Sequence, residues 1–245
     1  MQQRTEQLAI LEFENGNFAT TMRTDKVTSA DQGAVNPIAT AAVDRLFGRQ
    51  RDEYLTEAQR LIRACTGLIA ETGQVDPPVA AILERAGLAT RAFYRLFNSK
   101  EELIIAVLQD GTTSKTGYTV EQMSAASTPL DRVEAWVRAV VLPYTQDVLQ
   151  GYRAILLHTY RWETMFPTEI AAMREQLLQP LVHAITDLRG DDDPKNAHTA
   201  AEFIYDAFFG VACRAEAQRR LVDPDEVTAL TRMAELIATS FSATE

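Results

Sequence analysis

The stretch from residue 79 to residue 97 constrains the fold more than any other part of this sequence. Its first half places apolar residues at helical spacing directly after Asp76 and Pro77, which are typical of a helix cap and a helix start. Gly87 then provides a residue that readily adopts the left-handed conformation in which helices commonly end. A second short helix follows, with Phe93 on its buried side. Two short helices joined by a tight turn containing glycine predict a helix-turn-helix.

Two longer helices are predicted on either side of this pair. Ser99 and Glu102 form a capping box, in which each residue satisfies a backbone donor of the other, and the helix after it is expected to end near Thr113. The helix ahead of the pair is expected to end near Gly73. Its apolar face contains Leu55, Ala58, Ile62, Cys65 and Ile69. Packing of this face across the pair would complete a three-helix unit, and the helix after Ser99 would link it to the remainder.

This region resembles the TetR family of bacterial transcriptional regulators over residues 53–110. The matching positions are Ala86, Gly87, Leu88, Ala92, Phe93, Tyr94, Phe97, Ser99, Lys100, Glu101, Glu102 and Leu103. The resemblance implies a DNA-binding head followed by a helical domain that binds an effector and dimerises. Ala89 and the pair Pro77-Pro78 replace residues that carry hydroxyls in the family pattern, so DNA affinity is expected to depend more on arginines.

The second short helix is expected to enter the major groove of DNA with its N-terminal residues at the base edges. Thr90 and Arg91 would reach bases, and Ala92 would lie near a thymine methyl group. Through the resemblance, Tyr94 and Lys100 match residues that meet phosphate. Further candidate DNA contacts are Arg95, Arg49 and Arg51. The alternatives are an ordinary solvated helix face for the arginines and, for Arg95, an acidic neighbour.

The charge distribution leaves this interpretation open, although the net charge of −10 argues at first against nucleic acid. Residues 1–43, 44–117 and 118–245 carry net charges of −2, 0 and −8. The acidity therefore belongs to the C-terminal half, and attraction to phosphate depends on the local surface rather than on the total. Cys65 and Cys213 lie far apart and are expected to be core thiols in a cytoplasmic protein.

The whole chain is predicted to be all-α. From Thr128 onward, helical patterns alternate with capping residues that are followed by proline, and no strand-like alternation occurs. Three regions are expected: a flexible N-terminal arm (1–35), a helix-turn-helix DNA-binding domain with a preceding short helix (36–115), and a helical effector-binding and dimerisation domain (116–245). The short helix would start at Pro37 and end at Gly48, and the loose stretch 111–127 would contain the boundary.

Prolines inside two C-terminal patterns suggest where a cavity lies. Pro143 and Pro180 each remove a backbone hydrogen bond and are expected to kink or split their helices, which leaves room between them. The candidate effector pocket is lined by Trp136, Tyr144, Tyr152, His158, Tyr160, Trp162 and Phe166. Core packing is the alternative role for each of these side chains.

The last two helical patterns are apolar enough to form a dimer interface, as the resemblance implies. The candidate interface residues are Phe208, Val211, Ala212, Leu230, Met233 and Ile237. The alternative is that both helices close the core of a single protomer.

The expected function is a TetR-like regulator, in the usual mode of that family a repressor. It would bind a pseudo-palindromic operator as a homodimer and be released by a hydrophobic small-molecule effector. One alternative is a helical-bundle DNA-binding or interaction protein without an effector. An enzyme is not expected, because the three histidines have no Glu-x-x-His partner and no phosphate loop or nucleophile motif occurs. No cofactor, metal site or membrane association is expected either.

Overall fold

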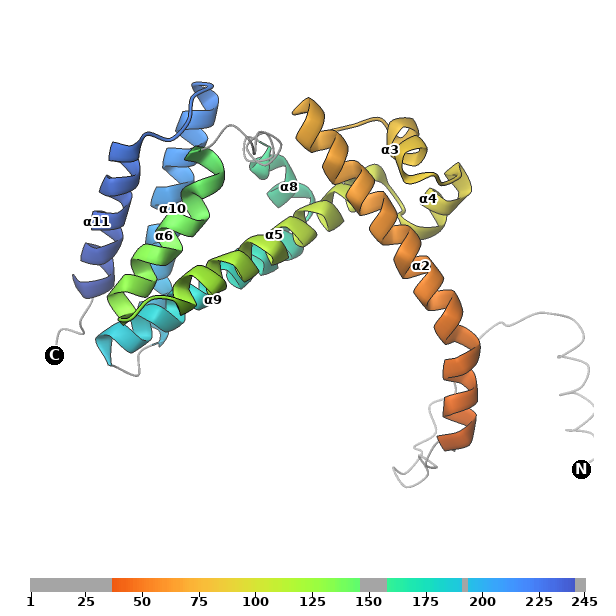
Figure 1. Ribbon diagram of the computed structural model, residues 1–245, viewed down its shortest axis with the longest axis horizontal. Helices are drawn as coiled ribbons and strands as arrows, with labels where there is room; N and C mark the ends of the chain where they lie inside the picture. The colour runs from red at the N-terminus through yellow and green to blue at the C-terminus, as the bar shows by residue number, and fades with distance from the viewer. Residues whose placement is uncertain (1–36, 146–157, 191–193, 241–245) are drawn as a thin grey trace, which may run out of the picture. The chain divides into compact units, whose positions relative to one another are not determined.

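The computed structural model describes residues 37–145, 158–190 and 194–240, and every regular element within them is an α-helix (Figure 1). This confirms the all-α prediction, whereas the expected arm at residues 1–35 lies outside the described residues. The helices are α2 (Pro37–Thr72), α3 (Val79–Ala86), α4 (Thr90–Leu96), α5 (Lys100–Ser124), α6 (Pro129–Thr145), α8 (Thr159–Met165), α9 (Pro167–Arg189), α10 (Pro194–Ala217) and α11 (Pro224–Ser240).

Helices α3 and α4 form the predicted helix-turn-helix. Gly87 ends α3 with φ of 62°, and its N–H donates to the carbonyl of Glu84 across 3.1 Å. A side chain at this position would be strained, since left-handed backbone is rarely adopted by residues other than glycine. From α2, Arg60 donates to the carbonyl of Ala86 at 2.5 Å, so that helix satisfies an open acceptor at the end of α3. The turn and the packing helix therefore support each other.

The start of α5 has the predicted capping interactions. The N–H of Glu102 donates to the Ser99 hydroxyl across 3.1 Å, and the Glu102 carboxylate accepts from the N–H of Asn98 across 2.6 Å. The carboxylate thus reaches one residue further back than in the usual reciprocal box. Both contacts fix the angle at which the chain leaves α4 and enters α5.

Two of the predicted boundaries are wrong. Helix α2 is a single helix through Gly48 rather than a short helix followed by a second one. Helix α5 runs on past Thr113 to Ser124, so the stretch expected to be loose is helical. Its hydroxyl side chains bond to carbonyls one turn earlier, as Thr119 does to Lys115 across 2.8 Å. These bonds accommodate residue types whose composition suggested a loop.

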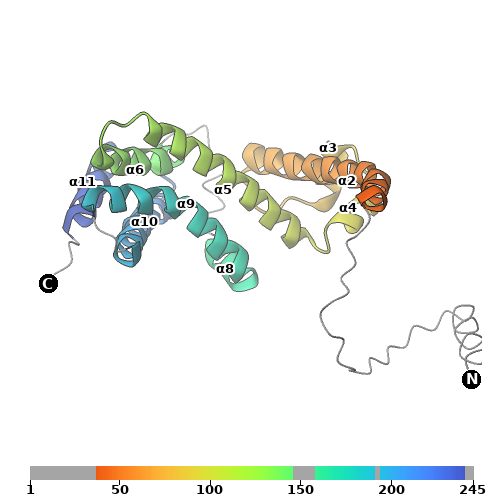
Figure 2. The ribbon, with the colours of Figure 1, turned by 90° about the horizontal axis from the view of Figure 1, so that it is seen from below.

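The C-terminal helices pack around a second core, separate from the one beneath the helix-turn-helix. Helix α5 contributes to both cores, and Figure 2 shows it running from the group of α2, α3 and α4 to α6. Trp136 is buried in the second core, where its indole N–H donates to the carbonyl of Leu177 across 3.0 Å. Helices α6 and α9 continue through Pro143 and Pro180, so neither proline splits its helix there. No described helix has the length and apolar character needed to span a membrane.

Candidate functional site

Helix α4 presents a polar surface to solvent while its aromatic face anchors it. Phe93 is fully buried in the head core, that is, the apolar cluster beneath α3 and α4, and its ring meets the Phe97 ring with centroids 6.0 Å apart. Thr90 and Arg91 are exposed, and Tyr94 is 64% exposed. A short helix held by buried rings with Thr, Arg and Tyr outward has the features of a recognition helix.

One predicted base contact is not favoured by the packing. Ala92 is only 7% exposed and faces the protein, so its methyl group offers little surface to a thymine. Of the three residues predicted to contact bases, Thr90 and Arg91 are the two whose side chains are exposed. Within the described part of the chain, no acidic side chain pairs with Arg91.

Two of the other candidate DNA contacts are held by acidic neighbours. Lys100 Nζ lies 2.6 Å from a carboxylate oxygen of Asp76, and Arg95 pairs with Glu57. The Arg95 guanidinium also lies 4.6 Å from the centroid of the Tyr54 ring. Arg95 therefore makes the contact with an acidic neighbour that the sequence left as its alternative. Each cation must exchange a carboxylate for a phosphate if it is to bind DNA.

Arg49 and Arg51 are exposed on α2, five and three residues before Tyr54. Both are placed where a charge can meet solvent or a phosphate. Exposure alone does not distinguish these two roles, so their contact with DNA remains a prediction.

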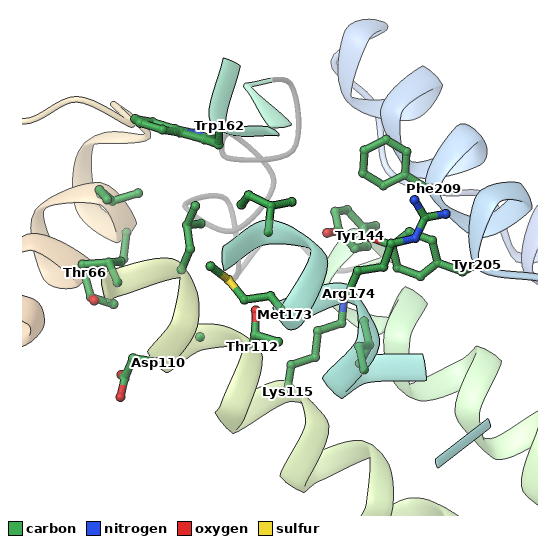
Figure 3. A pocket seen from close by; sticks show the side chains of 17 residues that line it. Thr66, Asp110, Thr112, Lys115, Tyr144, Trp162, Met173, Arg174, Tyr205 and Phe209 are labelled. Carbon is green, nitrogen blue, oxygen red and sulfur yellow. The ribbon is translucent and has the colours of Figure 1, made fainter. Parts of the chain in front are cut away.

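A cavity of about 190 Å³ lies beside the head core. It is lined by Thr66, Ile69 and Ala70 of α2; Val107, Leu108, Asp110, Gly111, Thr112 and Lys115 of α5; Tyr144 of α6; Trp162 of α8; Ile170, Met173, Arg174 and Leu177 of α9; and Tyr205 and Phe209 of α10 (Figure 3). The volume is many times the roughly 10–15 Å³ that one ordered water needs. Since α2 belongs to the head and α10 to the C-terminal bundle, a molecule in the cavity would touch both.

Lys115 is the cation inside this cavity that has no acidic partner among the described residues. Its Nζ lies 5.4 Å from the Tyr144 ring centroid and 5.1 Å from the Phe208 ring centroid. Burial of the ammonium lowers the pKa of Lys115 to about 8. Burial also raises the pKa of Tyr144, and that of Tyr205 rises to about 12. The side chain is thus charged at neutral pH and surrounded by uncharged rings.

Two further polar atoms of the lining are buried without a hydrogen-bond partner in the described structure. They are the indole Nε1 of Trp162, a residue only 2% exposed, and the guanidinium Nε of Arg174. The other end of the Arg174 guanidinium pairs with Asp206 and lies 4.7 Å from the Tyr205 ring centroid. Buried donors are costly to leave unsatisfied, by about 1–3 kcal/mol each, which makes both atoms informative about what the cavity holds.

The predicted pocket residues divide into three groups. Tyr144 and Trp162 line the cavity, whereas Trp136 is core and Phe166 packs against the head core. His158 is exposed at the start of α8. Tyr152 and the side chain of Tyr160 lie outside the described residues. Lys115, Arg174 and Tyr205 also line the cavity, and the sequence does not predict them there, because they are not part of the predicted aromatic set and the stretch around Lys115 has the composition of a loop.

The six predicted interface residues are not equally available to a partner. Phe208, Ala212 and Leu230 are buried within the protomer, so they close its own core, as the alternative had it. Val211, Met233 and Ile237 are partly exposed beside that core. The most exposed large apolar side chains of α10 and α11 are instead Phe203 (52%) and Leu236 (65%).

The thiols and acidic groups form no further site among the described residues. Cys65 is buried, and burial, with Asp76 nearby, raises its pKa to about 12; burial likewise raises the pKa of Cys213. A thiol with a raised pKa is a poor nucleophile and a poor metal ligand. No group of three residues among those described has the types and positions needed to hold a metal ion.

Comparisons with known proteins identify relatives of both the head and the whole fold. The sequence profile of the family described as "Bacterial regulatory proteins, tetR family" matches residues 61–107. The HTH-type transcriptional activator FasR of Mycolicibacterium smegmatis is 26% identical over 156 residues, which are 62% of this chain and 69% of FasR.

Solved structures extend the similarity to the C-terminal helices. A TetR transcriptional regulator from Rhodococcus sp. RHA1 matches with a TM-score of 0.60 and 23% identity, over 78% of this chain and all of that chain. The transcriptional regulator FadR from Bacillus subtilis, solved in complex with stearoyl-CoA, matches with a TM-score of 0.50 and 16% identity, over 75% of this chain and 99% of that chain. At these identities the likeness shows the fold.

Proposed function

We propose that this chain, which belongs to the tetR family of transcriptional regulators, binds a pseudo-palindromic operator as a homodimer and leaves it when a hydrophobic small molecule fills the cavity. The observation that carries the proposal is the composition of the cavity wall. Helix α2, which packs against α3, supplies Thr66 and Ile69, while α10 of the C-terminal bundle supplies Tyr205. A ligand between them contacts the DNA-binding head directly.

The mechanism we propose is a two-state equilibrium of the dimer. One state holds the two copies of α4 about 34–36 Å apart, which is one turn of DNA, and the other does not. A ligand favours the second state only through its higher affinity for it. Helix α5 is the element we expect to transmit the change, because it starts at the capping box after α4 and lines the cavity with five residues between Val107 and Thr112 and also with Lys115.

In the DNA complex, Thr90 and Arg91 would contact bases, while Tyr94, Lys100 and Arg95 would contact phosphates. Arg49 and Arg51 would add charge from α2. The exposure of Thr90, Arg91 and Tyr94 on a helix anchored by buried Phe93 supports this assignment. Guanine is the base an arginine pairs with most readily, through two parallel hydrogen bonds.

Repression is the direction of control that we propose, with ligand binding as the signal that relieves it. FasR is named an activator, so activation is the competing direction. A reporter gene placed behind the selected operator separates the two: deletion of the regulator raises expression under repression and lowers it under activation.

Selection of bound sequences from a random double-stranded DNA pool, at two salt concentrations, tests the DNA-binding part of the proposal. An enriched inverted repeat with two half-sites supports a dimeric, sequence-specific regulator. Salt-sensitive binding without an enriched sequence would overturn it, because phosphate contacts alone carry no sequence information.

A thermal-shift screen of small apolar compounds tests the effector part. A ligand present at 100 times its dissociation constant stabilises the folded protein by roughly 2.7 kcal/mol. A stabilising compound that also weakens operator binding supports the effector. Compounds that bind without changing operator affinity would favour the alternative, in which the C-terminal bundle serves only as a structural and dimerisation module.

A further inference from the structure

Three polar side-chain atoms of the cavity wall lack a matching acceptor or acidic partner among the residues that the structure describes, and all three are hydrogen-bond donors. Two of them, Trp162 Nε1 and Arg174 Nε, are buried without a hydrogen-bond partner in the described structure, and the third, Lys115 Nζ, has no acidic partner among the described residues. An ammonium and an indole N–H have no lone pair with which to accept a hydrogen bond. A ligand that satisfied these atoms would have to bring acceptors, and preferably a negative charge.

The charge balance of the lining points the same way. Its charged residues are Asp110, Lys115 and Arg174, and Arg174 already pairs with Asp206. Asp110 is exposed, and Figure 3 shows its carboxylate turned away from the Lys115 side chain. Among the residues that the structure describes, Lys115 is therefore a positive charge of the cavity wall without an acidic partner.

The rings around Lys115 stabilise the ammonium only in part. A cation lying over an aromatic face gains about 0.5–2 kcal/mol, whereas desolvation of an ion costs several. The ammonium lies more than 5 Å from the centroids of both Tyr144 and Phe208, at the long end of such contacts. An anion placed beside Lys115 would provide the missing interaction at short range.

We propose that the effector is an anionic amphiphile: a molecule with an apolar body in the cavity and a carboxylate or similar acidic group that pairs with Lys115. Trp162 Nε1 donates a second hydrogen bond, to a carbonyl or other acceptor on the body of the ligand. Figure 3 shows Lys115 extending toward the rings of Tyr144 and Tyr205, with Trp162 on the side of the cavity nearer Thr66. Lys115 and Trp162 would thus bind different parts of the same ligand.

This proposal depends on the cavity being the effector site, and it adds a charge requirement to it. Under this proposal, Lys115 determines which ligand charge the cavity accepts. The apolar and aromatic side chains of the wall discriminate poorly between molecules of the same shape and different charge. A site with an unpaired cation should bind neutral analogues more weakly than anionic ones, because they leave that cation unpaired, and should exclude cationic analogues.

The test is isothermal titration calorimetry on the full chain with three probes of equal chain length: octanoate, octan-1-ol and octyltrimethylammonium. We expect octanoate to bind at least 10-fold more tightly than octan-1-ol and the cation not to bind. Lys115→Met should remove the preference for octanoate while leaving octan-1-ol binding intact, and Trp162→Phe should weaken both modestly. Lys195→Met, at an exposed lysine of α10 outside the lining, is the matched control and should behave as wild type.

The outcomes separate this inference from the proposed function. Equal affinity for octanoate and octan-1-ol, or preferred binding of the cation, overturns the anionic assignment and leaves the cavity as an effector site. Absence of binding by all three probes overturns the effector site and this inference with it. If Lys115→Met fails to unfold cooperatively, Lys115→Arg replaces it: retention of the octanoate preference with the guanidinium supports the charge role, and its loss despite a folded protein contradicts it.

Discussion

Lys100 Nζ and the Asp76 carboxylate lie 2.6 Å apart, so the lysine at the first position of α5 is bound to an acidic residue from the loop before α3. The lysine side chain is largely buried, whereas that of Asp76 is about half exposed. The ion pair joins the segment before α3 to the segment after α4. It also occupies the charge that would bind a phosphate.

Asp76→Asn is therefore expected to strengthen binding to DNA of any sequence by a few fold. In this variant Lys100 can bind a phosphate without first giving up its ion pair with the Asp76 carboxylate. Lys100→Ala should weaken all sequences alike and reduce the slope of log affinity against log salt by about 1. Fluorescence anisotropy over a salt series measures both. Glu121→Gln, which removes one exposed negative charge from α5, is the control. If Asp76→Asn binds DNA no more tightly than Glu121→Gln does, the Asp76 carboxylate does not compete with phosphate for Lys100.

Arg91→Ala is expected to relax base preference at one position of each half-site. Loss of a bidentate contact to guanine weakens binding to the operator with the preferred base by about 1–3 kcal/mol. Binding to operators with another base at that position should not change. Competition between the selected operator and single-base variants measures the effect. Arg138→Ala on α6 removes the same charge and should leave discrimination intact. If Arg91→Ala discriminates as well as wild type, α4 does not enter the groove by its N-terminal end.

Lys115→Met is expected to stabilise the ligand-free protein by on the order of 1–2 kcal/mol in urea unfolding at pH 7. The variant removes a buried charge without an acidic partner and keeps a side chain of similar length. A less stable variant would mean that the aromatic contacts of Lys115 outweigh its desolvation, and the ammonium would then be structural.

The same stability difference should shrink as pH rises. The pKa of Lys115 is lowered to about 8 in the folded protein from its ordinary 10.5, so the unfolded chain binds more protons between these values. Wild-type stability relative to Lys115→Met therefore rises from pH 8 upward. Of the neighbouring groups, Tyr144 and Tyr205 have raised pKa values, so both stay protonated in this window; the guanidinium of Arg174 also lines the cavity and pairs with Asp206. A difference independent of pH between 7 and 10 would argue against a buried ammonium.

Glu226 is expected to stabilise the protein at neutral pH and to lose this effect in acid. Its carboxylate accepts from Arg220 at 2.7 and 2.9 Å and from the N–H of Asp223 at 3.1 Å, which lowers the pKa of Glu226 to about 2. The contribution of Glu226 to the free energy of unfolding is fully present above pH 4.5, the ordinary pKa of a glutamate. It disappears as the pH falls through about 2. Glu226→Gln should cost about 1 kcal/mol at pH 7 and little at pH 2. Equal cost at both pH values would show that the carboxylate acts only as a hydrogen-bond acceptor.

The head could be predicted closely because its signals are local. Gly87 provides a left-handed helix end, Ser99 and Glu102 define the next helix start, and Phe93 marks the buried face. Each of these depends on residues within a few positions along the chain. The tetR pattern depends on the same residues, so periodicity and family resemblance lead to one answer.

The cavity could be predicted only in part, because its wall depends on packing between distant helices. Tyr144 and Trp162 are predicted because aromatic residues gather near Pro143 and in the next helical pattern. The same pattern predicts Trp136, yet Trp136 satisfies its N–H within the core and Trp162 does not. Composition could not distinguish these two indoles. Glycine, threonine and serine around Lys115 predict a loop, whereas α5 is helical there and the hydroxyls of Thr113 and Ser114 donate to carbonyls four residues earlier.

The measurement that tests the central claim most directly is the affinity of the wild-type protein for its selected inverted repeat against a scrambled duplex, at one fixed physiological salt concentration. A sequence-specific dimeric regulator should prefer the repeat by roughly 10³-fold or more, with one dimer bound per repeat. Equal affinity for the two duplexes, or binding of a single half-site as tightly as the repeat, would contradict the account.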